Sequence, residues 1–584
     1  MGPSLISNCL NRYSSYRITA ALIAWSLASV THGQVQIAGV EGRLLENILI
    51  HLNLDDETCD APEWRVREQS ERSGAEIRAA LEAYGYYSPE ASTTLSFGED
   101  CWSADISVDL GEPVRLRRVD IAVAGEGGAD PIFLQLIAAS ELREGEPLLH
   151  AAYDALKRGL LDVAQRRGYA EAAFTATRID VYPLERVADV VLQLDSGPRY
   201  SFGAITTSQD ILDPVMLERY YEFRTGDPFH RNHLTALYGA LIDSGYFNSV
   251  DVRPQTPDRE TRQIPIQIVL TPGRRRVLSY GVGYSTDTGP RLRVGRTDRR
   301  VNTRGAQFGV NGQLSPVISE LSFNYRFPYG DPRSEWISLD AGIKHEDTET
   351  AVSNTLELGI RRVAKRGSNW QETRFIDLQI EDFEVADIKS RSRLLMPGMS
   401  WLRLEADNTL RPERGYRLGF EVTGANDTLG SDTTFLQLTA EAKWIRSFGN
   451  DHRLLVRGRV GAIWEDDFTQ LPPSVRFFAG GDNSIRGYDF ESLGPVDAAG
   501  QVIGGNRLIV ASIEYEFPLV RRWSAALFVD AGNAFRDNDF ETSTGVGAGI
   551  RWQSPLGPIR VDLAKPLDGE ERDLQLHVSL GADL

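Results

Sequence analysis

The stretch Leu436 to Trp444, LQLTAEAKW, decides the fold, because apolar and polar residues alternate along it without a break. Such a period of two is typical of a β-strand with one apolar and one polar face. Glu441 and Lys443 place full charges on the polar face. A soluble sandwich would turn the apolar face inward, whereas a membrane barrel would turn it outward around a wet interior. This stretch alone leaves both fold classes open.

The same alternation recurs from about Val277 to the end of the chain, for example in Ile337–Lys344 and in residues 574–584. The strands are long, their polar faces carry charges, and aromatic residues such as those of Phe327-Pro328-Tyr329 stand near strand ends. Long strands of this kind with interfacial aromatic residues favour a barrel. We therefore predict an all-β transmembrane barrel over residues 276–584, which is long enough for about 16 strands.

The first strand of this barrel carries small residues on its polar face. Gly281 and Gly283 stand there between serines. Glycine weakens a strand because it loses more entropy on ordering and has no side chain to pack. We predict a weak seam between this strand and the last one, to which Leu580 and Gly581 belong. Ordinary strand variation is the alternative interpretation.

Charge and the N-terminus indicate where the protein works. The net charge of −19 argues against nucleic acid as a partner. Residues 1–33 place Arg12 and Arg17 before an apolar run from Ile18 to Val30, which predicts a secretory signal peptide. Further along the sequence there is no uninterrupted apolar run of about 18 residues, so an exported chain would enter a membrane as a closed barrel.

The three cysteines predict one disulfide. Cys9 lies in the expected signal peptide, which leaves Cys59 and Cys101 as an even pair in an exported chain. We expect no metal site there, since His51 is the sole nearby imidazole. The sequence has no Gly-x-Ser-x-Gly elbow, helical histidine pair or cysteine cluster, so we expect neither an enzyme nor a cofactor.

The first half of the chain repeats itself with a period of about 80 residues. Its clearest marker is a Gly-Tyr pair, at 85–86, 168–169 and 245–246. A helical pattern precedes each pair, two strands follow it, and another strand opens each repeat, which gives the order β-α-α-β-β. In the first repeat Ser73 with Glu76 is similar to a capping box and suggests a helix start.

This order, with these glycines, resembles the POTRA domain, and we predict three such repeats over residues 34–113, 114–198 and 199–275. A small sheet has free edges, and an edge accepts an extended peptide as an added strand. We expect a periplasmic docking arm. A spacer without a binding role is the alternative.

A glycine-rich stretch interrupts the barrel strands: Phe477 to Gly494, FFAGGDNSIRGYDFESLG. Gly480 and Gly481 allow a tight fold, after which Arg486, Gly487 and Tyr488 follow. The composition predicts a shaped loop that presents one arginine and one aromatic ring. By itself the stretch is also compatible with an ordinary surface loop.

The alternation of inward-facing and outward-facing residues in a later strand predicts a partner for Arg486. In FVDAG, Leu527 and Val529 form the apolar set, so Phe528 and Asp530 face the lumen, and Gly532 follows. We predict an ion pair between Arg486 and Asp530. Asp562 also faces inward by parity and is the second candidate, although Arg560 on the same face could neutralise it.

Taken together, the repeats and the barrel motifs resemble the BamA/TamA superfamily of outer-membrane insertases. Arg486-Gly487-Tyr488 matches the superfamily's motif in an inward-folded loop, and Phe528, Asp530 and Gly532 match its Phe-x-Asp-x-Gly motif. The three repeats, the cysteine pair in the first of them and the Gly-x-x-Leu ending look TamA-like. The resemblance implies a barrel in the cell outer membrane with its POTRA arm in the periplasm.

The resemblance also implies a function. It suggests an insertase that helps assemble autotransporters and other β-barrel proteins. The predicted weak seam adds a mechanism, strand exchange, in which an exposed edge templates an incoming strand. The implied partners are a TamB-like inner-membrane-anchored protein, unfolded outer-membrane proteins and outer-membrane lipid. A secretion pore of the two-partner type and a BamA-like general assembly factor are the alternatives.

Overall fold

The computed structural model describes residues 33–367, 369–386, 388–408, 411–449, 451–554, 557–568 and 573–580. Apart from Gly33, the expected signal peptide lies outside the described residues, and so do Gly581 and the Gly-x-x-Leu ending. Contacts divide the chain into two bodies, residues 1–200 and 201–584. Each body is described by itself.

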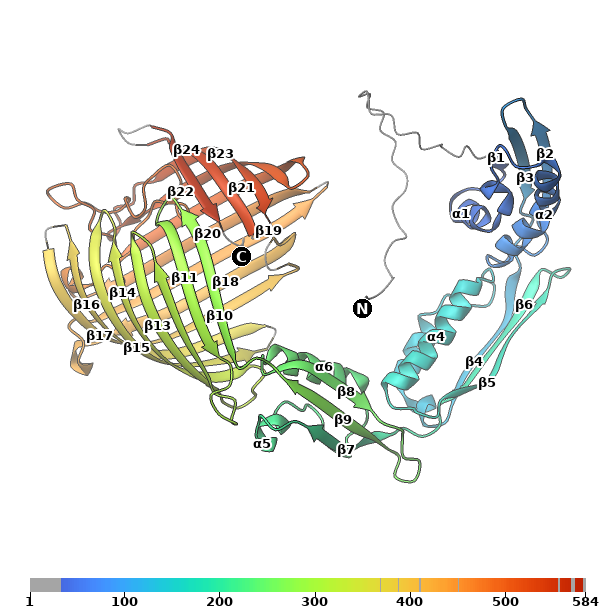
Figure 1. Ribbon diagram of the computed structural model, residues 1–584, viewed down its shortest axis with the longest axis horizontal. Helices are drawn as coiled ribbons and strands as arrows, with labels where there is room; N and C mark the ends of the chain where they lie inside the picture. The colour runs from blue at the N-terminus through green and yellow to red at the C-terminus, as the bar shows by residue number, and fades with distance from the viewer. Residues whose placement is uncertain are drawn as a thin grey trace. The chain divides into compact units, whose positions relative to one another are not determined.

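The first body contains two repeats of the order β-α-α-β-β, as predicted (Figure 1). The first repeat comprises β1 (Gln34–Ala38), α1 (Gly42–His51), η1 (Asn53–Asp56), α2 (Glu63–Glu82), β2 (Glu90–Phe97) and β3 (Trp102–Asp109). The second comprises β4 (Arg115–Ala124), η2 (Glu126–Ala129), α3 (Pro131–Ala138), α4 (His150–Arg166), β5 (Ala173–Tyr182) and β6 (Val187–Asp195). Their sheets have the strand orders β1-β3-β2 and β4-β6-β5, and in each the opening strand runs parallel to the central one.

Helix α2 is longer than the capping-box pattern suggests. It begins at Glu63, and Ser73 lies inside it, fully buried, where its Oγ donates to the carbonyl of Ser70 at 2.7 Å. The suggested helix start at Ser73 is therefore wrong. Residues 63–72 are mostly charged or polar, and Val66 is the only buried residue among them. They therefore extend the helix with a largely solvated stretch. Apolar periodicity does not reveal such a stretch.

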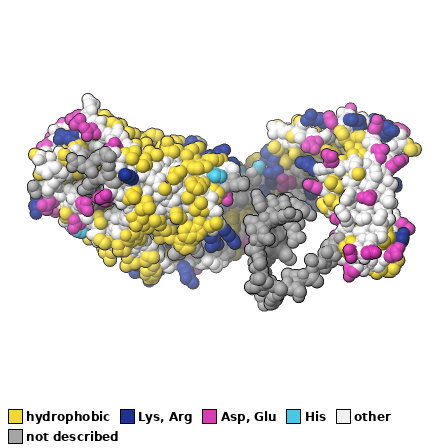
Figure 2. All heavy atoms as spheres, turned by 90° about the horizontal axis from the view of Figure 1, so that it is seen from above, with side chains coloured by type: hydrophobic (Ala, Val, Ile, Leu, Met, Phe, Trp, Pro, Cys, Tyr) yellow, Lys and Arg dark blue, Asp and Glu magenta, His cyan; other side chains and the backbone are white. Residues whose placement is uncertain are grey.

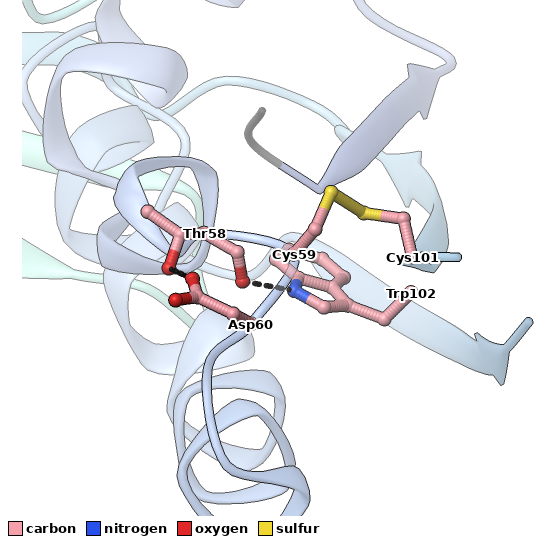
Figure 3. The surroundings of a disulfide bond; sticks show 5 residues. All are labelled: Thr58, Cys59, Asp60, Cys101 and Trp102. Carbon is pink, nitrogen blue, oxygen red and sulfur yellow. Dashed lines mark hydrogen bonds between the residues drawn. A yellow bond between two sulfur atoms is a disulfide. The ribbon is translucent and has the colours of Figure 1, made fainter. Parts of the chain in front are cut away.

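The predicted cysteine pair forms a disulfide in the first repeat (Figure 3). It connects the segment after η1 with the residue before β3, across a Cα–Cα distance of 4.6 Å. Beside it the buried Trp102 donates its Nε1–H to the carbonyl of Thr58 at 3.0 Å. The disulfide and the indole therefore hold the same loop against the sheet.

The third repeat belongs to the second body. It comprises β7 (Ser201–Ser208), α5 (Pro214–Glu218), α6 (Arg231–Asp243), β8 (Phe247–Pro254) and β9 (Gln263–Pro272), with the strand order β7-β9-β8. The Tyr246 hydroxyl donates to the carbonyl of Gly305 at 2.6 Å, and Arg219 Nε donates to the carbonyl of Gly330 at 2.9 Å. Arg333 pairs with Glu222. The third repeat is thus attached to two short turns of the barrel, residues 299–306 and 329–334.

In the described residues, sixteen strands, β10 to β25, form a closed barrel, and this confirms the predicted fold class. They are β10 (Arg276–Ser285), β11 (Gly289–Asp298), β12 (Gln307–Leu314), β13 (Ile318–Pro328), β14 (Glu335–Asp347), β15 (Ala351–Arg366), β16 (Trp370–Val385), β17 (Ile388–Ala406), β18 (Arg414–Ala425), β19 (Phe435–Phe448), β20 (His452–Glu465), β21 (Arg507–Val520), β22 (Trp523–Phe535), β23 (Ser543–Ser554), β24 (Gly557–Pro566) and β25 (Gln575–Leu580). Short 3-10 turns η3 (Asp427–Leu429) and η4 (Phe468–Gln470) lie in the connections.

The apolar faces of the strands point outward. On β10, Leu278, Tyr280 and Val282 expose 58%, 74% and 76% of their surface. Figure 2 shows hydrophobic side chains gathered over the outer wall of the barrel. A soluble sandwich would bury these residues, so their exposure matches a membrane barrel instead. Separately, no helix among the described residues is long and apolar enough to cross a membrane.

Among the described residues, the seam between β10 and β25 has the fewest residue pairs of the junctions in the barrel. Within the described residues the two strands share the single pair Ser285–Ser579, whereas β16 and β17 pair along residues 370–385. Two further bonds join Thr286 with Val578, one from the Thr286 N–H and one to its Oγ1, both at 3.1 Å. Among the described residues, Gly281 and Gly283 pair with Arg293 and Arg291 of β11.

Candidate functional site in the barrel lumen

The segment between β20 and β21, residues 466–506, is packed into the barrel rather than lying on its surface. Phe477, Ala479 and Ile485 are buried in a hydrophobic cluster with inward-facing barrel residues such as Leu508. Bridges between Phe477 and Gly505 and between Ala479 and Leu493 fold the segment back on itself. We call residues 477–494 the lumen loop.

Arg486 forms the centre of a buried network of charges. Its Nε and Nη2 donate to the two carboxylate oxygens of Asp530 at 2.7 and 3.0 Å. Its Nη1 donates to Glu514 at 2.7 Å and to Asp562 at 3.1 Å. The guanidinium carbon also lies 3.4 Å from the centre of the Phe528 ring. Arg486 therefore contacts both carboxylates that parity placed in the lumen, rather than one or the other.

A second arginine completes this network. Arg551 on β23 donates to Glu514 at 2.7 Å and 3.0 Å and to Asp562 at 2.5 Å. Glu514 thus bridges the two arginines. Sequence reasoning missed Glu514 and Arg551, although the parity that gives Asp530 also turns Glu514 inward. Parity does not give the register between neighbouring strands. It therefore does not predict which of the inward-facing charges lie close together.

The backbone of the loop approaches the barrel wall closely. A Cβ atom at Gly545 of β23 would lie 1.8 Å from the carbonyl oxygen of Arg486. Gly487 has φ of +96°, and a Cβ there would lie 3.1 Å from the backbone of β24 at Lys565. Gly532 likewise brings β22 against the carbonyl of Ile509. Glycines at these positions let the arginine reach its partners.

Tyr488 and Arg457 hold the loop on either side of Arg486. The Tyr488 hydroxyl donates to the carbonyls of Asp568 and Thr544 at 3.3 and 3.4 Å. Arg457 on β20 donates to the carbonyl of Ser484 at 2.8 Å. The motif Arg486-Gly487-Tyr488 is thus fixed to the wall through side chains and backbone together.

Asp482 forms a second centre, which sequence reasoning also missed. Its carboxylate accepts from Ser285 Oγ and Thr286 Oγ1, both at 2.8 Å, and contacts His577 Nδ1 at 2.7 Å. Its own N–H donates to the Asp287 carboxylate at 2.9 and 3.1 Å. One residue of the lumen loop therefore contacts both strands of the seam.

Asp287, Asp482 and His577 could hold a metal ion by distance, since their ligand atoms lie within 4.8 Å of one another. The imidazole is already engaged at both nitrogens, however, because His577 Nε2 accepts the N–H of Gly487 at 2.9 Å. Its proton must then sit on Nδ1, directed at Asp482. A metal at Nδ1 would need the opposite tautomer, so the arrangement fits a hydrogen-bonded cluster better than a metal site.

Comparison with known proteins agrees with this geometry. Residues 304–583 match the Omp85 superfamily domain, and residues 34–110 match the POTRA domain described as TamA domain 1. These matches define the class: an outer-membrane β-barrel protein whose POTRA repeats lie in the periplasm. More particularly, the chain belongs to the BamA/TamA superfamily, as the sequence motifs indicated.

Two curated relatives are similar over most of the chain. The outer membrane protein assembly factor BamA of Nitratidesulfovibrio vulgaris is 25% identical over 87% of this chain, and that of Neisseria meningitidis is 23% identical over 82%. The alignments span 66% and 68% of those proteins, so this chain covers about two thirds of their length. The crystal structure of BamA from Haemophilus ducreyi lacking POTRA domains 1–3 superposes with a TM-score of 0.68 at 16% identity, over 80% of this chain and 99% of that one.

Proposed function

We propose that this protein inserts β-barrel proteins into the outer membrane. The observation that carries the proposal is the seam: β10 and β25 share one residue pair in the described part of the chain, while their other neighbours are paired along their length. Unpaired N–H and C=O groups at a strand edge are a template for another strand. An incoming chain would therefore find its first hydrogen bonds there.

The packed lumen loop supports action at the wall rather than transport through the pore. Its apolar residues and its buried arginine fill the region between β17 and β24 that a secretion channel would need open. This counts against the two-partner secretion alternative. It favours a protein that opens laterally, where substrate strand and lipid meet.

A TamA-type role is our finer proposal. It rests on the match of the first repeat to the TamA POTRA model and on the three repeats in the described residues. Autotransporters would then be among the substrates, and a TamB-like inner-membrane-anchored protein would be the partner. The free sheet edges β2, β5 and β8 offer sites for such a partner or for unfolded substrates. Similarity to BamA over most of the chain favours a general assembly factor as the second candidate.

The test is a crosslink that locks the seam. The register of Ser285 with Ser579 places Tyr284 opposite Leu580, so we would introduce Tyr284→Cys and Leu580→Cys. The matched control, Tyr280→Cys with Val294→Cys, crosslinks β10 to its other neighbour. In lipid vesicles, the locked seam should lose insertion of an autotransporter barrel and regain it on reduction, and the control should insert throughout. Wild-type insertion with the seam shown to be crosslinked would refute the proposal.

The finer proposal needs its own measurement. Cells lacking this protein should accumulate unassembled autotransporters while their porins assemble normally, and a long inner-membrane-anchored β-rich protein should copurify with the full chain. A general loss of porins would favour the BamA-like alternative.

A further inference from the structure

We propose that Asp482 is the latch of the seam: it ties the lumen loop to the first strand and thereby holds β10 against β25. This inference rests on the proposed function, because a latch matters only if the seam opens. It assigns a positioning role to a residue outside the Arg-Gly-Tyr motif. Three observations lead to it.

The first observation is that Arg486 anchors the lumen loop to one side of the seam. Its carboxylate partners Glu514, Asp530 and Asp562 stand on β21, β22 and β24. These strands precede β25 in the barrel, so the loop must move together with the C-terminal strands. Arg486 by itself does nothing to hold β10.

The second observation is that Asp482 reaches across to the first strand. Ser285 ends β10 and Thr286 follows it, and their hydroxyls both donate to the Asp482 carboxylate. On the other side the same carboxylate contacts His577 of β25. The side chains of Asp482 and His577 expose only 4% and 6% of their surface, so little water competes for these bonds. A charged acceptor strengthens each of them.

The third observation is that few direct bonds join β10 with β25 within the described residues. Apart from the Ser285–Ser579 pair, the described residues contribute the two bonds between Thr286 and Val578. The latch adds the two hydroxyl bonds to Asp482 and the bond from its N–H to Asp287. Within the described residues, Asp482 therefore adds hydrogen bonds at the seam to those that join the two strands directly.

Backbone geometry places the latch. Gly481 has φ of +98°, and a Cβ there would lie 2.9–3.1 Å from the Asp287 carboxylate. Only a residue without a side chain lets the Asp482 N–H approach Asp287 so closely. Release of Asp482 would leave β10 held to β25 by their direct bonds alone, while Arg486 would keep the loop in the lumen. Opening thus needs no expulsion of the loop.

The experiment measures the seam directly, without substrate. Spin labels at Tyr280→Cys on β10 and Leu576→Cys on β25 report the distance between the strands in the full chain, in lipid, by pulsed electron paramagnetic resonance. Both side chains are exposed on the outer wall and lie outside the latch. The test variants are Asp482→Asn and Ser285→Ala, and the second removes a latch hydroxyl while keeping the backbone pair with Ser579.

The matched control is Asp497→Asn. It makes the same charge change in the same connection. Within the described residues, the Asp497 carboxylate accepts hydrogen bonds from the nearby N–H groups of Ala499 and Gln501. Retained heat-resistant mobility in gels shows that each barrel is folded. If Asp482→Asn does not fold, Ser285→Ala decides the question.

We expect the ratio of open to closed seam to rise about tenfold in Asp482→Asn and about threefold in Ser285→Ala, with no change in Asp497→Asn. Unchanged distances in the folded test variants, or equal widening in the control, would overturn the latch. The proposed function is judged separately by insertion: a widened seam with wild-type insertion would support the latch and refute strand exchange at the seam.

Discussion

At the scale of single residues, the shape of one side chain explains the lumen network. The planar fork of Arg486 presents donors in several directions, so it binds Asp530 with two of its nitrogens and still reaches Glu514 and Asp562. A lysine would offer one point charge in place of this fork. The site therefore selects arginine by geometry as well as by charge.

Arg486→Ala should destabilise the barrel severely. It would leave Asp530, which is fully buried, without its bidentate partner and with only the looser ion pair to Arg457 at 3.6 Å. Removing one partner of a buried ion pair costs roughly 3–5 kcal/mol. In gels, the band of the folded barrel would convert to that of the unfolded chain at a lower temperature. Arg459→Ala is the control, since Arg459 is an exposed arginine of neighbouring β20, where a solvated charge is worth about 0–1 kcal/mol. Equal melting of the two variants would contradict a structural role for the network.

The double glycine offers a second residue-scale prediction. Gly481→Ala and Gly500→Ala both force a side chain into a left-handed backbone, at φ of +98° and +83°. The Cβ at position 500 meets open space, whereas the one at 481 meets Asp287. Gly481→Ala should therefore be less stable than Gly500→Ala by about 1–3 kcal/mol, as measured by denaturant unfolding in detergent. Identical midpoints would show that the close approach to Asp287 does not matter.

Sequence reasoning reached part of this site, and the reason is parity. Alternation around Leu527 and Val529 turned Asp530 inward without any knowledge of the fold. It gave no means to choose Glu514 or Arg551 among the other inward charges, because strand register is set by turns and packing. Asp482 was missed for another reason: its partners Ser285 and His577 are distant in sequence and meet only when the barrel closes.

At the scale of elements, the junction of the third repeat with the barrel depends on charges in the turn after β13. Burial alone would raise the pKa of the Asp331 carboxyl, but hydrogen bonds from the Arg333 side chain and N–H hold that pKa below its ordinary value of 3.8. Arg333 in turn pairs with Glu222 of the third repeat. Asp331 thus holds Arg333 in a position to pair with Glu222 of the third repeat.

The lowered pKa gives a signed prediction. A carboxyl whose folded pKa is depressed contributes its stability in full above the unfolded value and loses it as pH falls through the folded value. Spin labels at Tyr238→Cys and Arg304→Cys report the distance between the third repeat and the barrel turn. The distribution of that distance should therefore stay narrow from pH 8 to about 5 and broaden in acid below 3.8. Asp331→Asn should broaden it already at pH 7, while Asp258→Asn, in the β8–β9 turn, should not. Broadening in both variants would contradict this account.

The elements themselves were largely predictable. Period-two alternation found the barrel, and dividing its length gave about 16 strands, the number the structure describes. The start of α2 was not found, because its first ten residues carry almost no apolar periodicity. Tertiary contacts, including the buried Val66, decide where that helix begins.

At the scale of the whole molecule, the lumen loop should set the conductance of the barrel. Ala479 and Leu493 pair with each other, so residues 480–492 can be replaced by two glycines without separating the ends. The replacement also removes Arg486, so the measurement uses protein that retains the folded mobility in gels. This variant should conduct several-fold more ions in planar bilayers than the wild type, because a barrel of this size encloses an aqueous channel when it is empty. The control replaces the exposed tip 497–501, whose flanking Val496 and Val502 also pair. Equal conductance in all three proteins would show that the loop does not block the lumen.

The sparse seam also bears on how this protein reaches its own native state. The residues that meet there, Thr286 and Val578, are 292 positions apart in the chain, whereas hairpin neighbours are joined by short turns. Loop-closure entropy makes so distant a contact late to form. Ring closure is then the final step of folding, and until it occurs the newly made chain is an open curved sheet. In that state the chain has two strand edges without partners, as the substrate barrels of the proposed function would have.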